Sequence, residues 1–359
     1  MSELRYHPFL DQWVITATHR QERTFHPPAD YCPLCPTKPG GFPTEVPFES
    51  YDIVVFENKF PSLSPHPPEP EVHGSWLTPV RQSCGVCEVV LYSQDHNSTF
   101  ATLSFAQVRK LTRVWKERYV DLADRDYVDY VFIFENKGKE IGVTLSHPHG
   151  QIYAYPYIPP TLELELVAER AHFEKHSRPL MADVLAQEGI GVEDCGRIDP
   201  ISSLKEAPLI TGELTAESPA RNQGENRIVW QNATFVALVP FFARYPYEVW
   251  VTPKRHISSL RHMTEDDLDD LGEALLVVTR KYDKLFGFSM PYIMAMHQEP
   301  GAHGYAFNWF HVEFYPPYRT ANKLKYLAGS EAAAGAFIND TLPEVTSKTL
   351  RDLDYAPIR

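Results

Sequence analysis

Apolar residues in the first half of the chain recur mainly with the two-residue period of β-strands. Short runs rich in β-branched and aromatic residues predict strands at residues 11–16, 51–56, 88–92, 127–134 and 151–157. A proline-rich stretch from Pro61 to Pro79 lies among them and predicts an irregular surface connection. The pattern favours a sheet in this half of the chain.

Helical periods appear at two places in the same half. Ser104 and Gln107 form a capping box, and the apolar residues of one helix face follow it: Val108, Leu111, Trp115, Tyr119 and Leu122. Residues 161–176 come after two prolines and are amphipathic, so they predict a second helix. Residues 178–225 lose this periodicity and are predicted to form a linker or insertion.

The second half of the chain repeats the pattern of the first. Thr264 follows Ser104 at the same spacing along the chain at which His256 follows His96. Leucines at 268, 271 and 275 keep this spacing from three core positions of the first helix. A shared spacing for a cap, a histidine and three core positions indicates an internal duplication. The predicted organisation is a first repeat at 1–177, a linker at 178–225 and a second repeat at 226–359.

The stretch Ser146–Tyr153 contains two histidines one residue apart, His147 and His149. On an extended chain both rings point to one side, so one imidazole can hold a metal while the other does chemistry. In the second half, His311 and Glu313 have the same mutual spacing, and they align with His147 and His149 when the helix spacing is lengthened slightly. We therefore expect the duplicate to keep the metal-holding histidine and to carry a glutamate in place of a nucleophile.

Charge and length limit the class of partner. The chain has 359 residues, enough for two cores, and a formal net charge of −13 from 34 basic and 47 acidic side chains. Such a surface repels nucleic acid and anionic membranes, so a small ligand is the expected partner. The N-terminus carries charges early and no apolar run is long enough to span a membrane, which predicts a cytoplasmic protein.

The cysteines predict a metal site. There are five of them: Cys32, Cys35, Cys84, Cys87 and Cys195. An odd count with two Cys-x-x-Cys pairs favours metal ligation over disulfides in a reducing compartment. The two pairs together would form a four-thiolate zinc site. The first pair with His96 and His147 would serve equally well, and spacing alone does not choose between them.

Two further groups of residues suggest ligand binding. A second metal set, suited to iron or zinc, is predicted from Glu165, His297, His311 and Glu313. Arg20 and Arg23 lie three residues apart in a predicted loop, where two guanidinium groups can clamp a diphosphate.

Over almost its whole length the chain resembles the galactose-1-phosphate uridylyltransferases of the histidine-triad superfamily. The matching stretches are Asp11–Val14 with Arg20 and Arg23, Cys32 with Cys35, Asp95-His96, Phe134–Gly138, Gly142, His147–Gln151, Pro253–His256 and Phe314–Pro317. His-Pro-His-Gly-Gln is highly specific for this family when it follows Glu-Asn-Lys-Gly at this distance.

The resemblance implies a fold and a reaction. The fold would be α+β, with two fused histidine-triad repeats, each an antiparallel sheet with a long packed helix, in a homodimer. The reaction would exchange the UMP moiety between UDP-glucose and galactose 1-phosphate, within the Leloir pathway of galactose metabolism. It would follow a ping-pong route through a covalent uridylyl-histidine.

The resemblance also implies roles for individual residues. His149 would be the nucleophile, Gln151 would hydrogen-bond the phosphoryl oxygens, and Arg20 and Arg23 would contact the phosphates. Side chains and backbone around the nucleotide-sugar would come from Asn58, Asn136, Gly142 and Thr144. The hexose end would meet Lys325, Tyr326 and Glu331. Zinc would be bound by Cys32, Cys35, His96 and His147.

Two other functions remain open from the sequence. A nucleotide-sugar phosphorylase would use the same histidine but accept inorganic phosphate, and Lys325 and Glu331 weigh against it because they are placed for a sugar. A zinc-stabilised nucleotide-binding module without turnover is disfavoured because His149 is intact beside Gln151. The family pattern also differs from this chain at three positions near the second metal and the hexose, namely Glu313, Ser330 and Phe337.

Overall fold

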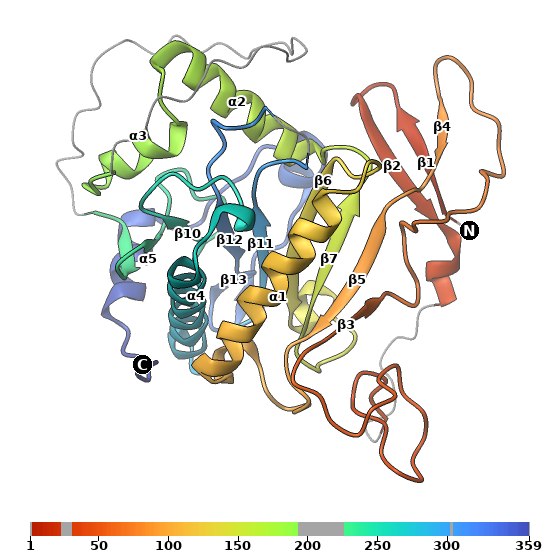
Figure 1. Cartoon of the computed structure of the whole chain (residues 1–359). Helices are drawn as coiled ribbons and strands as arrows, with labels where there is room; N and C mark the ends of the chain where they lie inside the picture. The colour runs from red at the N-terminus through yellow and green to blue at the C-terminus, as the bar shows by residue number, and fades with distance from the viewer. Residues whose placement is uncertain (1, 23–30, 193–225, 302–303, 359) are drawn as a thin grey trace.

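The computed structural model describes residues 2–22, 31–192, 226–301 and 304–358 (Figure 1). The strands of the first half are β1 (Ser2–His7), β2 (Gln12–Ala17), β3 (Val54–Glu57), β4 (Val80–Gln82), β5 (Val86–Leu91), β6 (Tyr130–Lys137) and β7 (His149–Tyr155). Those of the second half are β8 (Ile228–Gln231), β9 (Phe235–Leu238), β10 (Val249–Pro253), β11 (Tyr292–His297), β12 (His311–Tyr315), β13 (Tyr318–Thr320) and β14 (Lys323–Leu324). The α-helices are α1 (Phe105–Ala123), α2 (Pro160–His176), α3 (Leu180–Gln187), α4 (Glu265–Leu285) and α5 (Pro343–Asp352).

One antiparallel sheet of nine strands is the frame of the molecule. Its strand order is β3-β5-β7-β6-β11-β12-β10-β9-β8, so β6 of the first half pairs directly with β11 of the second. The predicted α+β class is confirmed. The two expected sheets are continuous, because β6 and β11 satisfy each other's backbone groups at what would otherwise be two exposed edges.

The helices α1 and α4 pack side by side on one face of this sheet (Figure 1). Their apolar faces form the main core with inward residues of the strands, which alternate with residues on the opposite face. Thr264 and Asp267 form a full capping box at the start of α4. The box expected for α1 is only half formed, because Gln107 turns its side chain to the carbonyls of Asp52 and Tyr92. None of the helices within the described ranges is long and apolar enough to cross a membrane.

The opposite face of the sheet is covered by other elements. A three-stranded sheet, β2-β1-β4, lies beside strands β5 and β7 of the first half, and the helices α2 and α3 lie near the second half (Figure 1). The helix α3 falls within the segment 178–225, for which no regular element was expected. Its Met181 and Leu185 pack against Trp309 and strand β9. Residues 193–225 of that segment, with Cys195, lie outside the described residues.

The two halves are related by an approximate two-fold axis at the β6–β11 seam. Gln151 of β7 lies opposite Phe134 of β6, and Glu313 of β12 lies opposite Ala295 of β11. Phe134 and Ala295 in turn face each other across the seam. The position of the axis is fixed by a repeated bond, because Nδ1 of His149 faces the carbonyl of His147 and Nδ1 of His311 faces that of Trp309 in the same way. Glu313 is therefore the counterpart of Gln151 in the second half.

This register corrects the predicted alignment of the two histidine motifs. When Glu313 is matched to Gln151, the counterpart of His149 is His311, and the counterpart of His147 is Trp309. The expectation that His311 repeats His147 was wrong by two residues. The second half has thus kept the histidine at the nucleophile position and lost the one at the metal position.

Candidate active site

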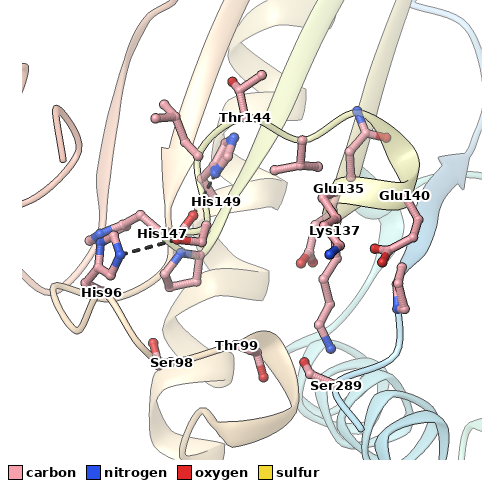
Figure 2. A pocket seen from close by; sticks show the side chains of 18 of the residues that line it. His96, Ser98, Thr99, Glu135, Lys137, Glu140, Thr144, His147, His149 and Ser289 are labelled. Atoms are coloured by element: carbon pink, nitrogen blue, oxygen red, sulfur yellow. Dashed lines mark hydrogen bonds between the residues drawn. The ribbon is translucent and has the colours of Figure 1, made fainter. Parts of the chain in front are cut away.

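A cavity of about 510 Å³ opens where strands β6 and β7 meet the end of α4. Its lining comes from the turn around His96, the loop 138–146, the start of β7, and residues 288–291 of the second half. Figure 2 shows His147 and His149 on one side of this cavity and Lys137 and Glu140 on the other. The predicted site residues Asn136, Thr144, His147 and His149 all lie in this lining.

The ring of His149 is held in one orientation by the backbone. Its Nδ1 lies 2.8 Å from the carbonyl oxygen of His147. A carbonyl can only accept, so Nδ1 carries the proton and Nε2 carries the lone pair. We expected an acceptor near Pro148, and the structure identifies it as the carbonyl of His147. This tautomer presents Nε2 as a nucleophilic atom.

Gly150 allows the strand to carry His149 past a buried tyrosine. A Cβ at Gly150 would lie 2.1 Å from the Tyr92 hydroxyl oxygen and 3.1 Å from the carbonyl oxygen of Phe134. The Tyr92 hydroxyl is buried and has no hydrogen-bond partner among the described residues. The close approach therefore reflects packing against the glycine.

We expect Gly150→Ala to lower the free energy of unfolding by about 2 to 3 kcal/mol, as overpacking of a filled core does. Urea denaturation measures this. Tyr92→Phe in the same chain should recover part of the loss, because it removes the hydroxyl oxygen. A Gly150→Ala variant as stable as the unsubstituted protein would contradict this account.

Other predicted ligand residues lie along the same face of the sheet. Gln151 is on that face because residues two apart on β7 point the same way as His149. Arg20 donates to the carbonyl of Phe60, 3.1 Å away, and lies 3.5 Å from the hydroxyl of Tyr153. Asn58 accepts from the amide of Phe60 at 2.9 Å. Arg20 and Asn58 thus gather at one loop beside β7, and Arg23 lies outside the described residues.

Gly142 and the predicted hexose residues are placed differently. Gly142 ends a short turn with φ of 82°, in the left-handed region, where glycine is the favoured residue. Within the described chain, the cavity lining does not include Lys325, Tyr326 or Glu331. Lys325 and Glu331 instead form an ion pair of 3.1 Å, and Tyr326 between them is 74% exposed. Their predicted contact with a hexose stays a prediction.

Charged residues of the cavity that the sequence did not single out include Glu135 and Lys137. Burial raises the pKa of Glu135 to about 8, while the nearby Lys137 and a hydrogen bond with Tyr292 act in the opposite direction. Lys137 pairs with Asp283 of α4 at 3.0 Å. Both belong to the Glu-Asn-Lys-Gly stretch that carries part of the family resemblance, but neither was assigned a role from the sequence.

The first predicted metal set is brought together by the fold. Ligand atoms of Cys32, Cys35, His96 and His147 all lie within 4.8 Å of one another. The sulfur of Cys35 lies 3.6 Å from Nδ1 of each histidine. Cys84 and Cys87 are not among the residues of this group, so the geometry favours two sulfurs and two nitrogens over four thiolates.

The surroundings of this set suit a positive ion. Nε2 of His147 lies 2.8 Å from the carbonyl oxygen of Ser93, so Nδ1, which faces the sulfurs, carries a lone pair. Burial lowers the pKa of His147 to about 4, which keeps the ring neutral. Burial and the neighbouring Cys32 raise the pKa of the Cys35 thiol to about 11. A cation is therefore needed to hold both sulfurs as thiolates at neutral pH.

The second predicted set, Glu165, His297, His311 and Glu313, also has its ligand atoms within 4.8 Å of one another. Glu165 comes from α2 and lies 2.7 Å from Nδ1 of His297. Nδ1 of His311 lies 3.0 Å from the carbonyl of Trp309, which repeats the arrangement of His149 and leaves the lone pair on Nε2. That Nε2 lies 3.3 Å from Oε1 of Glu313, yet neither atom forms a hydrogen bond within the described residues. Two facing acceptors require a cation between them, either a proton or a metal ion, and the donor set suits a metal.

Comparisons with known proteins agree over the whole chain. The family model for the N-terminal domain of galactose-1-phosphate uridyl transferase matches residues 1–159, and the model for its C-terminal domain matches residues 213–357. A galactose-1-phosphate uridylyltransferase of Thermotoga maritima is 40% identical over 361 residues, covering 99% of each chain. A solved uridylyltransferase structure superposes with a TM-score of 0.78 at 30% identity and covers 97% of both chains. An ADP-glucose phosphorylase from Arabidopsis thaliana shares the fold, with a TM-score of 0.67 at 22% identity over 99% of both chains. The chain therefore belongs to the galactose-1-phosphate uridylyltransferase family.

Proposed function

We propose that this protein transfers a uridylyl group between UDP-glucose and galactose 1-phosphate through a covalent intermediate on His149. The observation that carries the proposal is the hydrogen bond from Nδ1 of His149 to the carbonyl of His147, at the edge of a cavity large enough for a ligand. Family membership and a 40% identical uridylyltransferase support the substrate pair.

In the first step Nε2 of His149 attacks the α-phosphorus of UDP-glucose. The P–N bond forms as the bond from this phosphorus to the bridging oxygen breaks, and glucose 1-phosphate leaves. In the second step a phosphate oxygen of galactose 1-phosphate attacks the same phosphorus and the P–N bond breaks. Nδ1 keeps its proton throughout, and the His147 carbonyl that accepts its hydrogen bond stabilises the positive charge that develops on the ring.

The remaining polar residues bind and orient the substrates. Gln151, on the same face of β7 as His149, would donate to phosphoryl oxygens, and Arg20 and Arg23 would neutralise the phosphates. Asn58, Asn136, Gly142 and Thr144 would lie around the nucleotide-sugar. Lys325, Tyr326 and Glu331 would meet the hexose, and a homodimer in which they face the partner's cavity accounts for their place outside this one.

We also propose zinc as the ion of the Cys32, Cys35, His96 and His147 set. Two sulfurs and two imidazole nitrogens in one closed group are typical of structural zinc. Because the ligand His147 lies two residues before His149, the first residue of β7, a bound zinc ion would stiffen the start of this strand. For the second set, which offers two imidazoles and two carboxylates, we propose iron or zinc.

A phosphorylase is the alternative enzyme, because a protein of this fold bears that name. The test uses UDP-glucose labelled in the nucleotide. We expect an acid-labile, base-stable label on His149, released by galactose 1-phosphate as UDP-galactose. No label would exclude the covalent route. Label released by inorganic phosphate, and not by galactose 1-phosphate, would support the phosphorylase.

A further inference from the structure

Arg244 touches the second metal set from outside it. One of its guanidinium nitrogens lies 3.0 Å from Oε2 of Glu313 and 2.9 Å from the hydroxyl of Tyr315. Glu313 is fully buried, whereas Arg244 is partly exposed. The two carboxylate oxygens of Glu313 thus have different neighbours: Oε1 faces His311 and Oε2 faces Arg244.

The same guanidinium packs on aromatic rings. Its central carbon lies 5.4 Å from the ring centre of Phe337 and 5.3 Å from that of Tyr315. Tyr245 adds a third ring, 5.8 Å from Phe337. Partly buried contacts of a cation with aromatic faces are favourable, so Arg244 fixes Phe337 as well as Glu313.

Phe337 belongs to residues 325–341, which we call the hexose segment because it contains Lys325, Tyr326 and Glu331. The segment is tied to itself by the Lys325–Glu331 ion pair and by the bond from the Ser330 hydroxyl to the Ala336 carbonyl, at 2.7 Å. It is tied to the chain around Arg244 by two further bonds. Asn339 donates to the Ala243 carbonyl at 2.9 Å, and Thr341 donates to the Pro246 carbonyl at 2.8 Å.

We propose that Arg244 is a positioning residue that makes the placement of the hexose segment depend on the second metal. This inference rests on the proposed function, which gives the segment and the metal their roles. A cation bound beside Oε1 of Glu313 would fix the carboxylate, whose Oε2 lies 3.0 Å from Arg244. Without the cation, Glu313 would be free to turn toward His297, whose Nδ1 lies 3.9 Å from Oε1, and Arg244 would lose its fixed partner.

Hydrogen exchange of the hexose segment tests this coupling without a measurement of activity. The reference is the metal-loaded protein, and the metal-free form is Glu165→Gln with His297→Gln, because neither residue contacts Arg244 directly. Elemental analysis confirms the loss. We expect exchange of the segment to become faster in this form. Arg244→Met should exchange as fast with the metal bound, and removal of the metal should then add nothing.

Arg319→Met is the matched control. Arg319 also reaches the segment, through Asp340 at 3.2 Å, but the bonds it forms among the described residues go to Leu324 and Asp340 and not to the metal set. Its loss should loosen the segment while the dependence on metal persists. Equal exchange in the loaded and metal-free forms, or a protein that binds only one metal ion, would overturn the coupling.

Kinetics separate failure of this inference from failure of the proposed function. In Arg244→Met we expect KM for galactose 1-phosphate to rise about tenfold, the change that loss of one hydrogen bond to a charged group produces. Label on His149 at saturating UDP-glucose should still form. An unchanged KM would overturn the positioning role, whereas an unsubstituted protein that takes no label would overturn the proposed function instead.

Discussion

Replacement of His149 by glutamine is expected to lower the rate of uridylyl transfer by about 10⁴-fold or more, since loss of a covalent nucleophile removes the reaction path itself. Glutamine keeps the size and a hydrogen-bonding group, so binding of UDP-glucose should survive. The measurement is steady-state formation of UDP-galactose, together with intact-mass detection of the uridylyl adduct.

His73→Gln is the matched control because His73 is exposed and lies outside the cavity. It should keep both the rate and the adduct. If His149→Gln still formed an adduct of the same mass, the nucleophile would be another residue. An active variant without an adduct would indicate direct transfer between the two substrates.

Replacement of Cys32 by serine is expected to remove one equivalent of zinc and to lower the stability of the fold. A ligand present at a thousand times its dissociation constant stabilises a protein by about 4 kcal/mol, and we expect a loss of this order. The fold loses the stabilisation that zinc binding supplies, because serine cannot replace the thiolate ligand. Cys35, whose pKa is raised to about 11, would then become a neutral thiol. Elemental analysis and urea denaturation give the two readings.

Cys84→Ser provides the comparison within the same chain. Cys84 opens the other Cys-x-x-Cys pair but is not in the metal group. Its substitution should leave zinc in place and change stability little. Zinc lost in both Cys32→Ser and Cys84→Ser would restore the four-thiolate alternative that the spacing left open, whereas zinc retained in Cys32→Ser would point to Cys84 and Cys87 as its ligands instead.

The sequence predicted the four strands that the first half contributes to the main sheet, and the two long helices α1 and α4, because their periods are regular. The spacing shared by the two halves held for the caps of α1 and α4, at Ser104 and Thr264. The same reasoning misaligned the histidine motifs by two residues. A shift of two along a strand returns every side chain to the same face, so the hydrophobic pattern is blind to it. The strand pairs of Gln151 and Glu313, together with the matching bonds of His149 and His311 to the carbonyls two residues before them, resolve the register.

The candidate metal sets could also be predicted from the sequence, because histidine, cysteine and glutamate are recognisable as metal ligands by residue type alone. Their outer partners were not. Ser93 contacts His147 through a backbone carbonyl, which every residue has, and Arg244 reaches Glu313 from a distant part of the chain. The helix α3 was missed for a related reason. It is short and has no side-chain cap, and it is stabilised by packing against Trp309.

The seam between β6 and β11 has a consequence for how the cavity responds to dilution. Part of the wall of the cavity that contains His149, including Phe288 and Ser289, comes from the second half of the chain. If the halves were separate subunits, that wall would be lost whenever they came apart. Here a covalent connection keeps them at a high effective concentration at any protein concentration. This part of the cavity wall therefore stays assembled even in a single chain.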